Sequence, residues 1–182
     1  SAAFRVPEWQ QALVVQFGEI RGEPITSAGL HFKVPFIQDV RLFDKRMLTW
    51  DGDEERIPTG DEKFIRFDTT ARWRIADVRK FAETVINQAG AHARLDTILD
   101  GETRNVIARF PLVEAVRNTN AILEDIAERR KKAQEAAERG EVAEDAEVIG
   151  DIESIKQGRE ALSQLIVETA RKKLAPLGIE LI

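Results

Sequence analysis

Residues 65–75 read Ile-Arg-Phe-Asp-Thr-Thr-Ala-Arg-Trp-Arg-Ile, and apolar side chains alternate with polar ones along most of this stretch. Because successive side chains of a β-strand point to opposite faces, the period of two predicts a strand over residues 64–75. The face from Ile65 to Ile75 is expected to pack on a core. The opposite face, which is expected to meet water or a charged partner, carries Arg66, Asp68, Thr70, Arg72 and Arg74.

The residues before this stretch predict further strands. Leu13, Val15 and Phe17 alternate with Val14 and Gln16. Gly18 follows as a turn residue. Three shorter strand segments are expected at residues 40–43, 47–50 and 54–57, separated by charged or glycine-containing turns. The first 76 residues are therefore predicted to form a strand-rich subdomain.

The second half of the chain, residues 77–182, is predicted to form a helical subdomain. Asp77 is a plausible N-cap for the first helix, because apolar residues recur after it at helical spacing. Further helices are expected over 91–110, from about Asn120 with Ile122, Leu123 and Ile126 inward, and over 155–174, before a terminal strand. The order defines an α+β fold: a mostly antiparallel N-terminal sheet, then helices, then a short terminal strand.

An acidic stretch from about residue 131 to residue 154 interrupts the helical half. Acids outnumber bases there and apolar residues are sparse. Such a stretch is typical of a solvated helix or insertion, and the alternative is an acidic arm that binds a partner.

The composition excludes several classes of protein. The 182 residues carry a formal net charge of −5, with a pI near 5.3, which argues against a dedicated nucleic-acid binder. The chain has no Cys and two His, which excludes thiolate zinc sites and cysteine nucleophiles and leaves little material for Ser–His catalysis. No run of 18 apolar residues is present to span a membrane, and no signal peptide is recognised.

Sequence motifs for catalysis are also missing. The chain contains no GxGxxG, GxxxxGK[ST], HExxH or GxSxG pattern. The acid-rich residues 51–55 depart from a calcium-binding EF-hand loop, because Glu55 takes the third ligand position and Arg56 the glycine position. We therefore predict no catalytic residue, no cofactor and no metal site.

One apolar segment, Gly-Leu-His-Phe-Lys-Val-Pro-Phe-Ile at residues 29–37, allows two interpretations. Its alternation is typical of a half-buried strand in a hairpin packed into the core, and the residues alone favour this. The alternative is a loop that enters a lipid interface, with His31 and Lys33 near the headgroups. In that case the membrane-contacting side chains are Phe32, Val34, Pro35 and Phe36.

Four stretches resemble the SPFH, or band 7, domain family of stomatins, prohibitins, flotillins and HflK/HflC proteins. They are residues 11–19 (QALVVQFGE), 28–40 (AGLHFKVPFIQDV), 43–46 (FDKR) and 67–75 (FDTTARWRI). Within the family, the first stretch and the Phe43–Arg46 stretch with its following Trp-Asp-Gly-Asp are most similar to the bacterial HflC branch. The usual Pro-Gly-Leu of the family is Ala28-Gly29-Leu30 here.

The resemblance implies a non-enzymatic scaffold anchored in the inner membrane by one N-terminal transmembrane helix and followed by a coiled coil, both outside these 182 residues. It further implies that the domain lies on the periplasmic face with residues 1–76 next to the membrane. With that placement, the resemblance favours the interpretation in which residues 29–37 contact lipid. The implied partners are an HflK-like paralogue in an oligomer, an FtsH-type AAA protease that the scaffold regulates, and membrane lipid. Arg66, Arg72 and Arg74 would then contact a neighbouring subunit, unless they are solvated or paired within the domain.

Two other functions stay open on the sequence. One is a stomatin-like organiser of membrane microdomains without any link to FtsH. The other is a membrane protease subunit with its own peptidase activity, which the residue inventory favours less.

Overall fold

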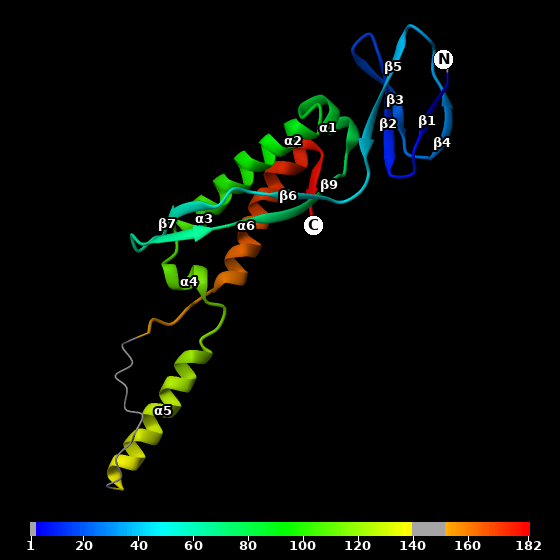
Figure 1. Ribbon diagram of the computed structural model, residues 1–182. Coiled ribbons are helices and arrows are strands. Elements are labelled where there is room, and N and C mark those ends of the chain that lie inside the picture. Colours follow the sequence, from blue (N-terminus) through cyan, green and yellow to red (C-terminus); the bar gives the residue numbers. More distant parts are fainter. Residues whose placement is uncertain (1–2, 140–151) are drawn as a thin grey trace. The chain divides into compact units, whose positions relative to one another are not determined.

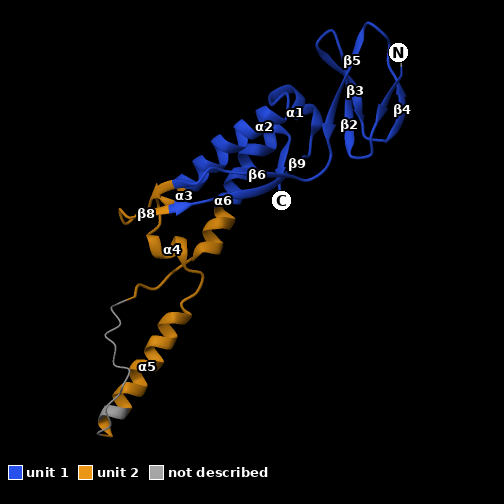
Figure 2. Ribbon diagram, viewed as in Figure 1, with its two compact units in different colours: residues 1–55, 66–104, 166–182 blue, residues 56–65, 105–165 orange. Residues whose placement is uncertain are grey.

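The computed structural model describes residues 3–139 and 152–182 (Figure 1). The chain folds into two compact units, and each unit draws on both halves of the sequence (Figure 2). Unit 1 contains residues 1–55, 66–104 and 166–182, and unit 2 contains residues 56–65 and 105–165. The subdomains predicted from the sequence, 1–76 and 77–182, stay a prediction.

The N-terminal strands of unit 1 form two small antiparallel sheets. One has the order β3-β2-β5 and the other pairs β1 with β4. The register places Gln16 opposite Gln38 and Ala3 opposite Phe32. The strands are β1 (Ala3–Val6), β2 (Gln10–Gln16), β3 (Glu19–Ile25), β4 (Gly29–Phe32) and β5 (Gln38–Asp44).

A third antiparallel sheet of unit 1 joins two strands from the middle of the chain to the C-terminal strand. Its order is β10-β9-β6, formed by β6 (Leu48–Asp51), β9 (Thr70–Ile75) and β10 (Ile179–Leu181). A separate two-stranded sheet pairs β7 (Glu55–Pro58) with β8 (Phe64–Phe67). The fold is thus α+β as predicted, with a terminal strand that pairs with the longest predicted strand.

The predicted strand over 64–75 is divided into β8 and β9. The division follows from a change of partner, since β8 pairs with β7 whereas β9 pairs with β6. Between them the backbone N–H of Gly52 donates to the carbonyl of Thr69 at 2.9 Å. The alternation of faces nevertheless holds across the break, with Trp73 buried and Arg72 and Arg74 exposed.

The core of unit 1 is built on aromatic residues. Trp50, Trp73 and Phe81 are almost fully buried. The rings of Trp73 and Phe81 stack with centroids 6.4 Å apart, and Phe43 meets Phe81 edge-on at 5.8 Å. These contacts join the N-terminal strands, the β10-β9-β6 sheet and the first helix into one core.

The first helix begins where the sequence predicts. The Asp77 side chain accepts a hydrogen bond from the Lys80 N–H at 3.1 Å, which confirms the predicted N-cap of α1 (Val78–Thr84). The predicted helix over 91–110 is α2 (Gln88–Leu95), a π-helical turn (Asp96–Asp100) and α3 (Gly101–Ile107). The indole N–H of Trp50 donates to Asp96 at the start of this π turn, at 2.6 Å.

Later helices differ in detail from the prediction. After α4 (Leu112–Val116), α5 runs over Ala121–Glu138, where Ile126 is buried but Ile122 is 49% exposed, so the inward assignment of Ile122 is wrong. The last helix, α6 (Arg159–Leu174), begins four residues later than predicted, and Ile155 is buried in the segment before it. A 3-10 turn (Ala175–Leu177) leads from α6 into β10. Of the acidic stretch 131–154, residues 140–151 lie outside the described residues.

Candidate functional site

The four residues predicted to contact a membrane lie on the surface. Phe32 is 76% exposed, Val34 is 48% exposed and Phe36 is fully exposed. Pro35, between them, is exposed as well. The alternative prediction, a hairpin packed into the core, is wrong for these side chains, because β4 ends at Phe32 and the following residues form a turn.

The turn between β4 and β5 is held in one conformation by Gln38. The backbone N–H of Val34 donates to Gln38 Oε1 at 2.9 Å, and the Gln38 N–H donates to the Val34 carbonyl at 3.1 Å. These bonds satisfy the backbone at both ends of the turn. Its apolar side chains therefore project from an anchored backbone.

Phe17 belongs to the same surface, and the sequence prediction placed it on a strand instead. It lies in the two-residue turn between β2 and β3, and its side chain is 83% exposed. Because Gln16 pairs with Gln38, this turn lies at the same end of the sheet as the β4–β5 turn. We call the exposed apolar residues at this end the apolar tip, comprising Phe17, Phe32, Val34, Phe36 and Ile37.

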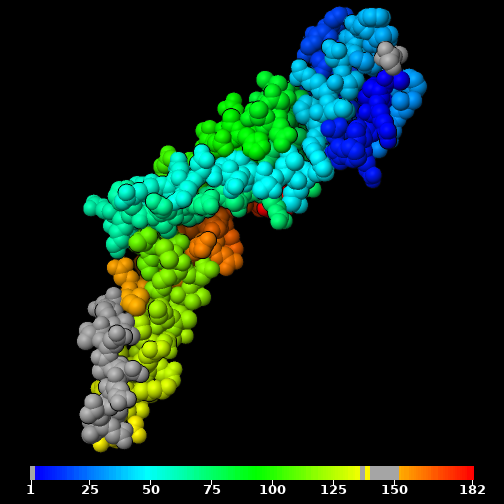
Figure 3. Space-filling model, in the orientation of Figure 1, coloured from blue at the N-terminus to red at the C-terminus, as the bar shows by residue number. Residues whose placement is uncertain are grey.

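Two residues of the apolar tip hold an unusual backbone conformation. Phe17 has φ of 52° and Phe36 has φ of 67°, in the left-handed region where glycine or asparagine is normal. An aromatic residue in this conformation costs about 1–2 kcal/mol, although Phe17 buries little of its surface in the fold and Phe36 buries none. Figure 3 shows the N-terminal strands in blue and light blue, with much of their surface in view.

The predicted charged face is largely paired within the chain. Arg66 lies 3.2 Å from Glu54, and Arg74 lies 2.6 Å from Glu180 on the neighbouring strand β10. Arg72, between them, is exposed, and within the described residues no ion pair of its side chain is found. Of the three arginines, Arg72 is thus the one available to a second molecule.

Acidic side chains gather near the π turn of unit 1. Burial raises the pKa of Asp100, and the neighbouring carboxylates of Glu55, Asp96 and Asp53 raise it further. Arg104 offsets part of this effect and pairs with Glu55 at 2.6 Å. In the part of the chain that the structure describes, no group of three or more such side chains is arranged to hold a metal ion.

We expect Asp100→Asn to stabilise the fold at pH 7 by about 0.5 kcal/mol. A carboxyl whose folded pKa is raised stabilises the fold only below its unfolded pKa, and that contribution is lost as pH rises through the folded pKa. The gain should therefore be larger at pH 7 than at pH 3.5, measured by urea unfolding. Glu8→Gln, which changes an exposed acid distant in sequence from Asp100, is the control. An equal gain in stability at both pH values would contradict a raised pKa for Asp100.

None of the described helices is long and apolar enough to cross a bilayer. The two histidines are placed away from any predicted catalytic pattern: His31 Nε2 bonds the carbonyl oxygen of Ser27 at 2.9 Å, and His92 packs edge-on against Trp73.

The fold agrees with the comparisons. Residues 4–182 match the SPFH domain / Band 7 family, and the chain belongs to this family. It is 36% identical over 179 residues to protein HflC of Treponema pallidum, which covers 97% of the chain and 52% of the relative. It is also 36% identical over 157 residues to protein HflC of Borreliella burgdorferi, covering 85% of the chain and 45% of the relative.

A third relative carries a functional name. The chain is 31% identical over 85 residues to "Modulator of FtsH protease HflC" of Escherichia coli K12, covering 44% of the chain and 25% of the relative. The chain spans about half the length of the first two HflC proteins.

Proposed function

We propose that this chain is the SPFH domain of a non-enzymatic membrane scaffold that modulates an FtsH-type AAA protease. The observation that carries the membrane part is the apolar tip, whose aromatic side chains are exposed from anchored turns. The names of the HflC relatives support the regulatory part. The absence of catalytic motifs from the sequence favours a scaffold over a peptidase.

The register of β1 also supports a membrane-facing tip. Ala3, the first described residue, lies opposite Phe32. The N-terminal end of β1 and the apolar tip are therefore at the same edge of the strand-rich region, as expected if a membrane anchor preceded β1. In this proposal the tip faces the periplasmic leaflet of the inner membrane.

The membrane contact is tested with vesicles of phosphatidylethanolamine and phosphatidylglycerol. We expect the chain to bind these vesicles weakly. Burying one Phe contributes only about 1.5–3 kcal/mol, and the tip offers few such side chains. The double variant Phe17→Asn, Phe36→Gly should weaken binding at least tenfold while thermal stability stays equal or rises, since both new residues suit the left-handed conformation. Binding is measured by flotation, and stability by circular dichroism.

Ile122→Ser removes an exposed apolar side chain elsewhere and serves as the control. If the double variant floats with vesicles as the original chain does, the membrane role of the tip is wrong. If instead its melting temperature falls by more than about 5 °C, the two aromatic residues are structural.

Assembly with further copies or with an HflK-like paralogue is the second part of the proposal, and Arg72 is the contact we assign to it. Without a membrane, we expect the chain to sediment as a monomer at micromolar concentration. On vesicles, tethering raises the local concentration, so chemical crosslinking should trap dimers and larger species.

We expect Arg72→Glu to reduce this crosslinking several-fold and to change stability by less than about 0.5 kcal/mol, because an exposed charge contributes little to folding. Arg5→Glu, at an exposed cation on another sheet, is the control. Unfolding of the Arg72 variant would show that this face is internal structure.

A stomatin-like organiser would share the membrane contact, so co-purification of an FtsH-type protease separates the two functions. A serine-hydrolase probe separates the scaffold from a peptidase, and we expect no labelling.

A further inference from the structure

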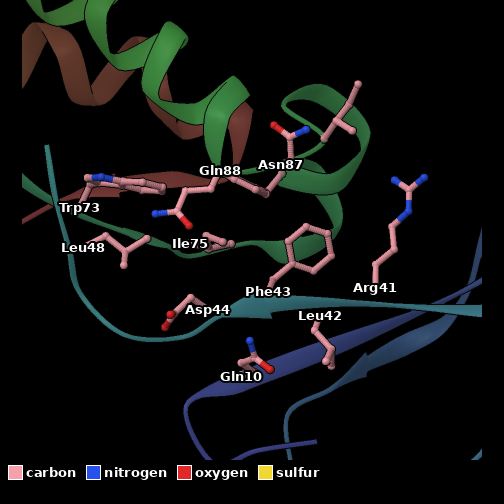
Figure 4. A pocket seen from close by; sticks show the side chains of 12 residues that line it. Gln10, Arg41, Leu42, Phe43, Asp44, Leu48, Trp73, Ile75, Asn87 and Gln88 are labelled. Atoms are coloured by element: carbon pink, nitrogen blue, oxygen red, sulfur yellow. The ribbon is translucent and has the colours of Figure 1, made fainter. Parts of the chain in front are cut away.

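Unit 1 contains a cavity of about 480 Å³ that neither the membrane contact nor the subunit contact uses. This volume lies in the usual range of ligand sites. Its floor is apolar, formed by Phe43, Trp73, Phe81 and their neighbours, and its mouth carries the amides of Gln10, Asn87 and Gln88. Figure 4 shows the Phe43 ring pointing from its strand toward the turn that carries Asn87.

Ile86 at the rim of this cavity is the strained residue of the region. It follows α1, where its N–H and that of Val85 both donate to the Phe81 carbonyl, at 3.0 and 2.9 Å. Its φ is 74°, a conformation in which glycine is the usual residue at a helix end and a β-branched residue is rare. The side chain is nevertheless 57% exposed and lines the cavity. An isoleucine at this position therefore strains the backbone without being buried in the core, so the stability of the fold does not explain it.

One of the strands that line the cavity lies at the edge of its sheet among the described residues. β5 is the last strand in the order β3-β2-β5, and four of its residues, 41–44, line the cavity. A terminal strand presents backbone N–H and C=O groups that an extended peptide can pair with. The amides of Gln10 and Gln88 at the mouth, which both donate and accept, suit the same kind of ligand. The Asn87 side-chain oxygen already accepts from the Gly90 N–H at 2.8 Å as the N-cap of α2 (Gln88–Leu95).

The position of the cavity argues against lipid as the occupant. Gln10 and Asp44 pair at one end of β2 and β5, whereas Gln16 and Gln38 pair at the other, where the apolar tip lies. Seven residues of strand separate these ends by about 20 Å. A bilayer in contact with the tip would thus lie far from the cavity.

The positive charge of Arg41 at the mouth favours an acidic ligand. Asp44 is paired with Arg46 at 2.8 Å, which also helps hold the pKa of Asp44 below its usual range. Arg41 is exposed, and in the described part of the chain no hydrogen bond or ion pair occupies its guanidinium. The mouth therefore carries one uncompensated positive charge, on the same face of β5 as Phe43 and two residues away from it.

We propose that this cavity binds an extended peptide segment of a partner protein as an added strand beside β5. One apolar side chain of the peptide enters the cavity against Phe43 and Ile86, and an acidic side chain two positions away pairs with Arg41. The spacing of two follows from the alternation of side chains along both strands. The exposed Ile86 side chain at the rim then packs against the apolar side chain of the ligand.

Two labelled peptides of equal composition test the spacing, with binding measured by fluorescence polarisation. The first, Thr-Asp-Thr-Phe-Thr-Asp-Thr, has its acids two positions from Phe, and the second, Thr-Thr-Asp-Phe-Asp-Thr-Thr, has them one position away. We expect the 182-residue chain to bind the first at least tenfold more tightly. Equal affinities, or no binding of the first, would overturn the proposal.

Two variants test the site itself. Ile86→Gly should weaken binding of the first peptide at least fivefold while the melting temperature holds or rises, because glycine suits the backbone there. Arg41→Glu should weaken binding of the first peptide. The same variant should bind more tightly a version of this peptide in which Lys replaces Asp. Ile122→Ala and Arg5→Glu, at exposed positions outside the cavity, are the controls and should bind as the original chain does.

Other occupants would give other results. Displacement of the peptide by vesicles would overturn the proposal in favour of lipid. Self-association of the chain that Ile86→Gly abolishes, without any peptide binding, would overturn it in favour of a second copy.

Discussion

Replacing Gly178 with alanine is expected to destabilise unit 1 by about 3 kcal/mol or more, one of the two largest losses we foresee for a single substitution. Gly178 lies between α6 and β10 with φ of 74°. A Cβ at this position would overlap the carbonyl oxygen of Asp77 and lie 2.8 Å from the Phe81 nitrogen. Both obstacles are backbone atoms of the α1 N-terminus, so no side-chain rotation can relieve them.

The hydrogen bonds around Gly178 explain why the backbone cannot simply move. Its carbonyl accepts from the N–H groups of Ala76 and Asp77 at 2.9 and 3.2 Å. Shifting Gly178 would break the bonds that hold β10 against the start of α1, and with them the N-cap of the helix.

Gly22 provides a matched control, since it has the same φ of 74° but open space around its missing Cβ. Gly22→Ala should therefore cost only the left-handed conformation, about 1–2 kcal/mol. The difference between the two variants in urea unfolding, followed by Trp fluorescence, measures the backbone overlap alone. Equal losses for the two variants would show that the approach at Gly178 is not tight.

Local patterns were sufficient for much of the fold. The alternation over 65–75 assigned each side chain to the correct face, because the direction of a strand side chain depends only on its position in the strand. The N-cap at Asp77 was predictable for a similar reason, as it depends on residues three apart. The break between β8 and β9 depends on which distant strand pairs with each part, and no local pattern contains that information.

The candidate site needed the structure. The alternation from Leu30 to Phe36 fits both a core strand and an exposed loop, so the residues favoured the more common of the two. Phe17 continued the alternation of β2 and was placed on its face, although the following Gly18 marked a turn. Its exposure follows from the two-residue turn, which requires positive φ at Phe17. The pairing of Arg74 with Glu180 joins residues 106 positions apart, so the sequence allowed a pairing within the domain but did not identify the partner.

Glu114 is the basis of the second large effect. This carboxylate is only 4% exposed and accepts three backbone hydrogen bonds from the segment before α6. The Lys156 N–H donates to Oε1 at 2.6 Å, and the N–H groups of Gln157 and Gly158 donate to Oε2 at 2.9 and 2.7 Å. Glu114 therefore fixes the start of α6 within unit 2.

Glu114 also makes unit 2 sensitive to acid. Burial by itself would raise the pKa of Glu114, but the N–H groups of Lys156, Gly158 and Gln157 together outweigh burial and hold the pKa below its ordinary value. A lowered folded pKa means that the stabilisation is present above the unfolded value of 4.5 and is lost as pH falls through the folded value.

We expect Glu114→Ala to destabilise unit 2 by about 3–5 kcal/mol, because it leaves three donors without their charged acceptor. Glu114→Gln, which keeps one acceptor oxygen, should cost about half as much and remove the acid sensitivity. All three Trp residues lie in unit 1, so the readout must be hydrogen exchange of the amides at 156–158 rather than fluorescence. Glu153→Ala, at an exposed acid of the same segment, should leave this exchange unchanged. Equal protection of these amides in the Glu114 and Glu153 variants would mean that the carboxylate does not hold the start of α6.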